Sequence, residues 1–312
     1  MSNNIFTRRP VVVGITMICC LLWGSAFPCI KLGYRMLEIP ADSPSSQILF
    51  AGIRFTLAGI MAVAVGSAAE KKLLIPSAKE VPKVCALSLF QTILQYTFFY
   101  IGLSHTTGTK SSVITASNVF LSIMVSALVF RTEKLTARKI AGCIIGFSGV
   151  LLVNITGDSD TSLSFRGEGL IFLSALSYAF SASVMKRFSS GTDPVLLSGW
   201  QFIAGGLFMT AAGASTGGEI GSINAKGVVM ILYLAFISAA AFSLWSLLLK
   251  HNEVSSVSVF GFMNPVFGVI LSVLLLSEDT GAGPLKISAA LILVAAGIIV
   301  VNRRPAIRKN NI

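Results

Sequence analysis

Charged side chains are scarce in this sequence. Only 12% of its 312 residues are Asp, Glu, Lys or Arg, whereas 54% are hydrophobic and the mean hydropathy is +0.81. A water-soluble domain carries roughly a quarter of its residues as charges. The composition therefore excludes an ordinary soluble domain and predicts an all-α integral membrane protein, in which each span uses about 20 residues.

Residue patterns that carry enzymatic chemistry are missing as well. The sequence has no Gly-rich phosphate loop, no His-Glu-x-x-His and no cysteine pairs with metal-ligand spacing. A Gly-x-Ser-x-Gly pattern at 213–217 follows an apolar run rather than a strand, which predicts a flexible connection. We therefore expect no catalytic residues, no metal and no cofactor. A membrane-embedded enzyme, the alternative from another class, would need a nucleophile, an acid and a base that the apolar runs lack. A channel would need a continuous polar stripe, and the polar positions are isolated.

Carboxylates are absent from the middle of every apolar run. Glu133 and Glu278 come nearest, and both fall at the ends of runs, among loop charges. A proton-exchange centre built on a carboxylate within the membrane therefore has no candidate residue. We expect facilitated diffusion, exchange or indirect coupling.

Long apolar runs are what the chain has instead. Nine are free of charge and a tenth contains only Arg54. A single intramembrane arginine is tolerated when it faces protein or water. The sequence thus predicts ten transmembrane helices, at 11–30, 46–69, 84–104, 111–130, 140–157, 169–185, 195–218, 227–249, 254–277 and 287–302.

Lysine and arginine are distributed unevenly between alternate connections. Seventeen lie on the side of both termini and five on the other, while Lys31 and Arg54 lie within spans and complete the 24. Because positively charged loops remain in the cytoplasm, we expect a multi-pass protein of the cell inner membrane with both termini cytoplasmic. The net charge of +11 follows from these clusters. The expected partners are therefore a small-molecule substrate and the lipid bilayer, and no nucleic acid.

The two halves of the sequence repeat each other. Trp23 precedes Lys31 by eight residues, as Tyr178 precedes Lys186, and Arg54-Phe55 corresponds to Gln201-Phe202. Five spans per half place the second half in the membrane in the opposite orientation, as in many secondary transporters whose midplane site lies between inverted repeats. We expect repeats at 1–157 and 158–312, together one membrane domain that works as a monomer. Duplication that merely builds a stable bundle is the other interpretation.

Several of these residues resemble the drug/metabolite transporter superfamily, and specifically its ten-helix EamA-type members. The resemblance covers about residues 11–302. It implies a transporter with a central cavity that works by alternating access and moves amino acids, nucleotide sugars, sugar phosphates or other metabolites. Such proteins often carry a proline where this sequence has residues 118–120, so a helix break there loses its usual signal. The residues that carry the resemblance are Trp23-Gly24-Ser25, Lys31, Arg54-Phe55, Glu133, Leu135, Gly142-x-x-x-Gly146-x-x-Gly149, Asn264-Pro265, Glu278 and Gly297.

Arg54 is the sharpest candidate for substrate contact. It lies about eight residues, or roughly 12 Å of helix, from the outer end of its span. It is either a clamp for a substrate carboxylate or phosphate, or a structural hydrogen-bonding hub for helix-end carbonyls. Gly142-x-x-x-Gly146 predicts close helix packing.

Polar and aromatic residues within the spans supply the remaining candidates. Amides and rings suit a small zwitterion with an apolar side chain, although interhelical hydrogen bonds and aromatic belts are the alternative role. One deep arginine disfavours phosphorylated substrates, which leaves export of an amino acid as the first expectation and export of drugs or cationic compounds as the second. The predicted substrate-binding residues are Trp23, Arg54, Gln91, Gln95, Tyr96, Asn118, Tyr178, Gln201, Trp245 and Asn264.

Overall fold

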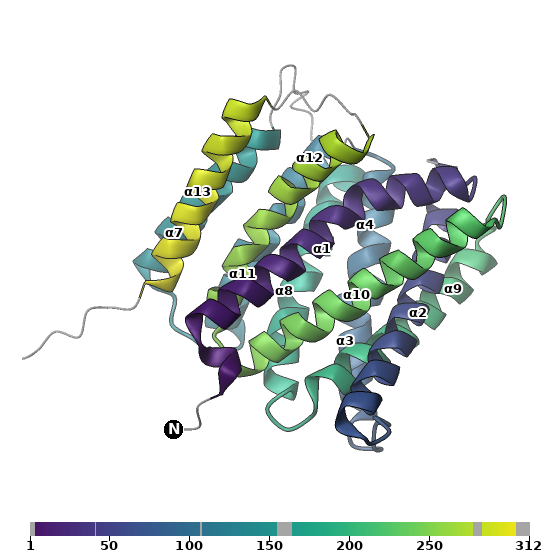
Figure 1. Cartoon of the computed structure of the whole chain (residues 1–312), viewed down its shortest axis with the longest axis horizontal. Coiled ribbons are helices and arrows are strands. Elements are labelled where there is room, and N and C mark those ends of the chain that lie inside the picture. Colours follow the sequence, from purple (N-terminus) through teal and green to yellow (C-terminus); the bar gives the residue numbers. More distant parts are fainter. Residues whose placement is uncertain (1–3, 41, 107, 155–163, 277–282, 304–312) are drawn as a thin grey trace, which may run out of the picture.

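The structure is a computed structural model that describes residues 4–40, 42–106, 108–154, 164–276 and 283–303. The regular elements of these residues are helices, packed side by side (Figure 1). After a short turn η1 (Ile5–Thr7), the first half has α1 (Arg9–Met36), α2 (Pro44–Glu70), α3 (Val81–Leu87), η2 (Ser88–Leu94), α4 (Gln95–Leu103), α5 (Gly108–Ala116), α6 (Asn118–Met124), η3 (Val125–Val129) and α7 (Ala137–Asn154). The second half has η4 (Phe165–Gly169), α8 (Leu170–Phe188), α9 (Pro194–Ser215), α10 (Ala225–His251), α11 (Val254–Ser258), η5 (Val259–Phe262), α12 (Met263–Leu276) and α13 (Pro284–Asn302).

The predicted spans are confirmed in their number and order. Within the described residues, eight helical segments are long and apolar enough to cross a membrane. The shorter apolar helix at 113–129 and the 18-residue α7 complete the ten. Three segments, η2, η3 and η4, are π-helical, a form found mostly as single turns within α-helices and frequently at functional sites.

Polar residues and prolines set where the helices begin. Asp193 caps α9, because its Oδ1 accepts 2.8 Å hydrogen bonds from the N–H groups of Val195 and Leu196. Asn224 caps α10 by accepting from the Gly227 N–H at 2.9 Å. Such side chains satisfy N–H groups that the first turn of a helix leaves free.

Two spans are interrupted near their middle, in equivalent places. Ser117 forms a turn between α5 and α6, and the 3-10 turn η5 separates α11 from α12. Pro265 lies in the first turn of α12, where its missing N–H costs no helical hydrogen bond. The break at Ser117 occurs although residues 118–120 contain no proline. The helix is therefore interrupted even without the usual signal.

The helices form two bundles that exchange segments between the halves. In the first bundle α1 packs against α10 and α12, and in the second α8 packs against α4, η2 and α6 (Figure 1). The pairs α2–α9 and α7–α13 each join equivalent helices of the two halves. This arrangement confirms two inverted five-helix repeats, because each first-half contact has a second-half counterpart.

Glycines allow the central pair, α2 and α9, to approach closely. A Cβ on Gly59 would lie 2.5 Å from the Gly199 carbonyl oxygen, and one on Gly206 would lie 2.5 Å from the Thr56 nitrogen. In the α7–α13 pair, a Cβ on Gly142 would lie 2.8 Å from the Gly297 oxygen, so the predicted packing role of Gly142 is confirmed. Small residues of this kind are what close helix contacts in membranes require.

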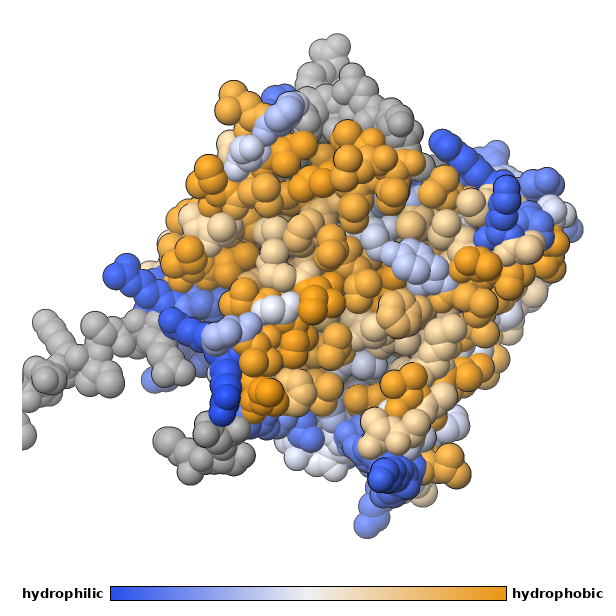
Figure 2. Space-filling view, viewed as in Figure 1, coloured by the Kyte–Doolittle hydropathy of each residue, from blue (hydrophilic) through white to orange (hydrophobic). Residues whose placement is uncertain are grey.

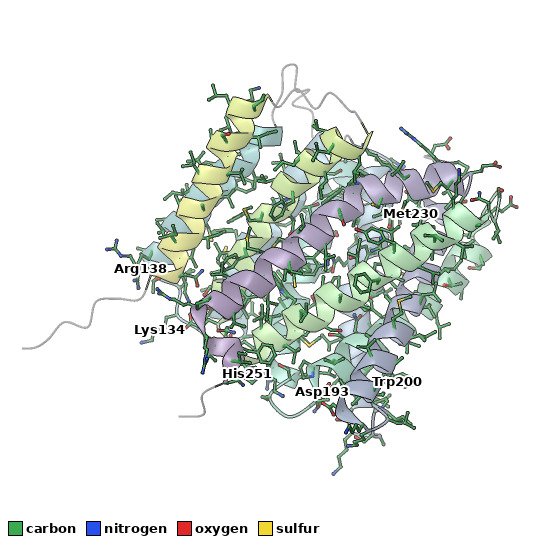
Figure 3. All side chains as sticks on the ribbon, viewed as in Figure 1. Lys134, Arg138, Asp193, Trp200, Met230 and His251 are labelled. Carbon is green, nitrogen blue, oxygen red and sulfur yellow. The ribbon has the colours of Figure 1, made fainter. Side chains whose placement is uncertain are left out.

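An apolar band crosses the face of the bundle seen in Figure 2, and polar side chains gather beyond it. The band includes exposed Ile18 and Leu21 of α1 and Phe236 of α10. Lys134, Arg138 and His251 lie along one edge of the molecule (Figure 3). We call the end where α1 begins and α13 ends the basic end.

The central contact predicts unequal effects of two alanines. Gly59→Ala should lower the free energy of unfolding by about 1–3 kcal/mol, because the new methyl group must displace the α9 backbone. Gly14→Ala is the control, since nothing lies within 4 Å of its Cβ position. Thermal denaturation in detergent measures both, and equal melting temperatures would contradict the close contact.

Candidate functional site

The predicted site residues lie on helices of both bundles and of the central pair. All ten fall within the described residues. They are Trp23 on α1, Arg54 on α2, Gln91 in η2, Gln95 and Tyr96 on α4, Asn118 on α6, Tyr178 on α8, Gln201 on α9, Trp245 on α10 and Asn264 on α12.

A continuous ladder of aromatic rings connects several of these residues across the interior. Neighbouring ring centroids in the ladder are between 4.4 and 5.1 Å apart. Tyr178 packs against the same buried cluster. Gln91, Asn118 and Asn264 carry amides rather than rings and are therefore not members of the ladder. In order, the rings are Tyr96, Phe55, Phe202, Phe242, Trp23 and Trp245.

At the centre of the ladder, equivalent residues of the two repeats contact each other. Phe55 and Phe202 are equivalent residues, and their rings stack with centroids 5.1 Å apart and planes 1° from parallel. Sequence reasoning missed both as site residues because a phenylalanine in an apolar run is indistinguishable from core. Their signal was the repeated pairs Arg54-Phe55 and Gln201-Phe202.

Arg54 is a buried cation without a described carboxylate partner. Arg54 is 4% exposed, and its Cζ atom lies 4.4 Å from the centroid of the Phe55 ring. The Nε and Nη1 atoms have no hydrogen-bond partner among the described residues. The hydroxyl groups of Tyr96 and Tyr34 interact with it electrostatically. Because a guanidinium stays charged and a buried charge is costly unless paired, this position favours an anionic group.

Gln201, the equivalent of Arg54, makes hydrogen bonds with the second bundle. Its Oε1 accepts from Thr92 Oγ1 at 2.6 Å, and its backbone oxygen accepts from Ser88 Oγ at 2.8 Å. Its Nε2 donor is buried without a described partner. This side chain therefore has a structural role through its oxygen and leaves its donor available.

Other buried polar atoms around the ladder are also unpartnered. The indole Nε1 atoms of Trp23 and Trp245, Oε1 of Gln95 and Oδ1 of Asn264 have no hydrogen-bond partner among the described residues. Nearly all buried polar groups in proteins are hydrogen-bonded, to protein or to water. Donors and acceptors from both bundles thus remain available for a polar solute at this site.

Two segments of the chain, residues 11–155 and 165–303, match the EamA-like transporter family. The chain belongs to this family. The segments cover nearly all of the sequence and correspond to the two repeats that the fold displays.

Two relatives of this EamA-like protein match it over almost their whole length. An uncharacterized transporter of Archaeoglobus fulgidus is 27% identical over 302 residues, which cover 95% of this chain and 99% of that protein. The uncharacterized transporter YvbV of Bacillus subtilis is 26% identical over 311 residues, or 97% of this chain and 94% of that protein. A crystal structure of a protein with 16% identity superposes with a TM-score of 0.76, over 95% of this chain and 97% of the other. That likeness supports the fold alone.

The hydrogen bond between Thr92 and Gln201 gives a test of the site's architecture. Thr92→Val in this EamA-like protein should lower the free energy of unfolding by about 1–3 kcal/mol, because the buried Gln201 oxygen loses its donor. Thr16→Val is the matched control, since the equally buried Thr16 Oγ1 donates to carbonyl oxygens of its own helix, those of Val12 at 2.7 Å and Val13 at 3.0 Å. Chemical denaturation measures both. A larger loss in the control would contradict the assignment.

Proposed function

We propose that this EamA-like protein is a secondary transporter that exports an amino acid, or a closely similar metabolite, across the cell inner membrane by alternating access. The observation that carries the proposal is Arg54, a buried cation beside an aromatic ladder between the two bundles. An amino acid offers a carboxylate for the cation and an apolar side chain for the rings.

Each part of an amino acid has a chemical counterpart in the site. The Arg54 guanidinium would bind the carboxylate through charge-assisted hydrogen bonds. The rings of Trp23 and Trp245, whose centroids are 4.9 Å apart, would attract the ammonium group through their faces. Gln95 and Asn264 supply unpartnered amide oxygens for the ammonium N–H groups. The other predicted residues, Gln91, Tyr96, Asn118, Tyr178 and Gln201, complete the proposed lining.

Export of cationic or lipophilic compounds is the second candidate. The cluster of Trp23, Trp245 and Phe242 favours it, because cations bind to aromatic faces without a carboxylate. Arg54 distinguishes the two candidates, because its positive charge attracts the carboxylate of an amino acid and repels a cationic compound. A membrane-embedded enzyme is disfavoured, because relatives over nearly full length are named transporters.

The orientation and assembly are parts of the same proposal. The basic end carries Lys134, Arg138 and Arg187, and positively charged ends of membrane proteins face the cytoplasm. Both termini would then be cytoplasmic. The repeats at 1–157 and 158–312 supply both halves of the site, so a monomer suffices.

Amino-acid exchange in proteoliposomes tests the substrate. Vesicles loaded with unlabelled amino acids should take up the same labelled amino acid, and Arg54→Gln should slow this uptake about tenfold to a hundredfold, the effect of losing a charge-assisted hydrogen bond. Arg54→Gln gives the first half the same amide side chain that the second half has at the equivalent position, Gln201.

Arg187→Gln at the exposed end of α8 is the control and should exchange at the wild-type rate. Uptake of a cationic dye that Arg54→Gln accelerates, without exchange of any amino acid, would contradict the substrate and favour the second candidate.

Cysteine labelling tests the orientation. Single cysteines at Ser190, exposed at the basic end, and at Ser215, exposed at the other, are introduced after Cys85→Ser. In intact cells an impermeant maleimide should label only the cysteine at 215, and in inverted membrane vesicles only the one at 190. The reverse pattern would invert the proposed topology.

A further inference from the structure

A cluster of charged residues joins the two bundles at the basic end. Lys139 at the start of α7 donates from its Nζ to Glu133 Oε2 at 2.7 Å and to Glu253 Oε2 at 2.9 Å. Glu133 follows η3 of the second bundle, and Glu253 precedes α11 of the first. The backbone N–H of Ser255 donates to Glu133 Oε1 at 3.1 Å, and its hydroxyl donates to Glu133 Oε2.

The Glu133 carboxylate is buried in this cluster, although it lies outside the spanning helices. Its side chain is 1% exposed and that of Lys139 is 11% exposed, whereas that of Glu253 is 58% exposed. Partial burial raises the pKa of Glu253, but hydrogen bonds and attraction from Lys139 outweigh it and lower the pKa overall. The Lys139 ammonium thus lies between the carboxyl groups of Glu133 and Glu253, which come from opposite bundles.

A second cation of the same end crosses between the bundles nearby. Lys186, in the last turn of α8, donates from its Nζ to the Leu249 carbonyl oxygen at 3.1 Å and to that of Asn252. These carbonyls belong to the C-terminal end of α10, in the first bundle, where a cation is favoured by the helix dipole. Lys186 also interacts electrostatically with Glu133 and Glu253.

Contacts at the opposite end of the molecule include several that stay within one bundle. The Ser222 N–H donates to the Leu37 oxygen at 3.2 Å, which joins the ends of α1 and α10. Thr106 Oγ1 donates to Glu168 at 2.5 Å, which joins the ends of α4 and α8. The charged cluster thus ties the bundles together at the basic end in the conformation described.

We propose that the cluster of Glu133, Lys139, Glu253, Ser255 and Lys186 is the gate of the basic end, which must break each time the carrier opens there. The proposal rests on alternating access and not on any particular substrate. Opening separates Glu133 and Lys186 from Glu253, Ser255 and the end of α10, and water then solvates their charges. The gate thereby sets which end is open when no substrate is bound.

Two native cysteines report on opening at this end. Cys19 and Cys20 are fully buried on α1, about a third of the way along it from the basic end, and their thiols donate to Ala241 and Phe260 oxygens of the first bundle. Both belong to a buried cluster that also includes Ala182 and Met185 of α8, in the second bundle. Parting of the bundles at the basic end would expose them.

N-ethylmaleimide labelling of the full chain, followed by mass spectrometry of its peptides, tests the gate without any substrate. Lys139→Gln leaves two carboxylates facing each other and should raise the labelling rate of Cys19 and Cys20 at least tenfold. Glu133→Gln should raise it less. Glu80→Gln is the matched control, because the hydrogen bonds that this carboxylate makes with described residues go to Ser77 of its own connection.

Two other cysteines distinguish opening from unfolding. Cys85 is exposed and should label equally in every variant, while Cys143 is buried and should stay protected. A gate predicts faster labelling at Cys19 and Cys20 alone. Unchanged labelling in both gate variants, or an equal rise at Cys143, would overturn the gate. Labelling in the expected order without amino-acid exchange would retain the gate and reject only the substrate.

Discussion

The contact between α2 and α9 is the constraint on which the rest of the structure depends. Gly59 and Gly206 bring the two backbones together, and Phe55 stacks on Phe202 beside them. α2 and α9 are equivalent helices of the two repeats, so their contact lies between the two halves of the chain. The two bundles are arranged around this pair, and the aromatic ladder extends from the stack into each of them.

The proposed site and the proposed gate both consist of polar groups in a largely apolar molecule. Arg54 and the unpartnered amides and indoles are held in the interior, where each buried polar atom without a partner costs free energy. The charged cluster around Lys139 lies at the basic end, where the exposed Glu253 side chain meets water. The proposed central site and the proposed gate are two elements that a carrier working by alternating access would use.

Much of the fold could be predicted because apolar runs recur along the whole chain and motifs recur between its halves. The apolar runs correspond to the helices of the structure, and the paired motifs indicated the inverted repeat. The break at Ser117 could not be predicted, because no proline marks it in the sequence. The π-helical turn that carries Gln91 likewise has no local signature.

The candidate site was predicted in part. Trp23, Trp245, Tyr96 and Arg54 carry visible polar or aromatic signals at unusual depth, whereas Phe55, Phe202 and Phe242 resemble ordinary core. The position of Glu133 at the end of a run suggested a loop charge. Its burial arises because α11, distant in sequence, and Lys139, six residues further along the chain, fold over it.

The most direct test of the account measures distances at both ends of the molecule by electron paramagnetic resonance. Spin labels at Thr7 and Arg187 report the basic end, and labels at Arg35 and Arg166 report the other, in chains without native cysteines. In Lys139→Gln the basic-end distance should lengthen while the opposite distance shortens, as two bundles rock about α2 and α9. If both distances stay fixed, or change in the same direction, the bundles do not rock and the account is wrong.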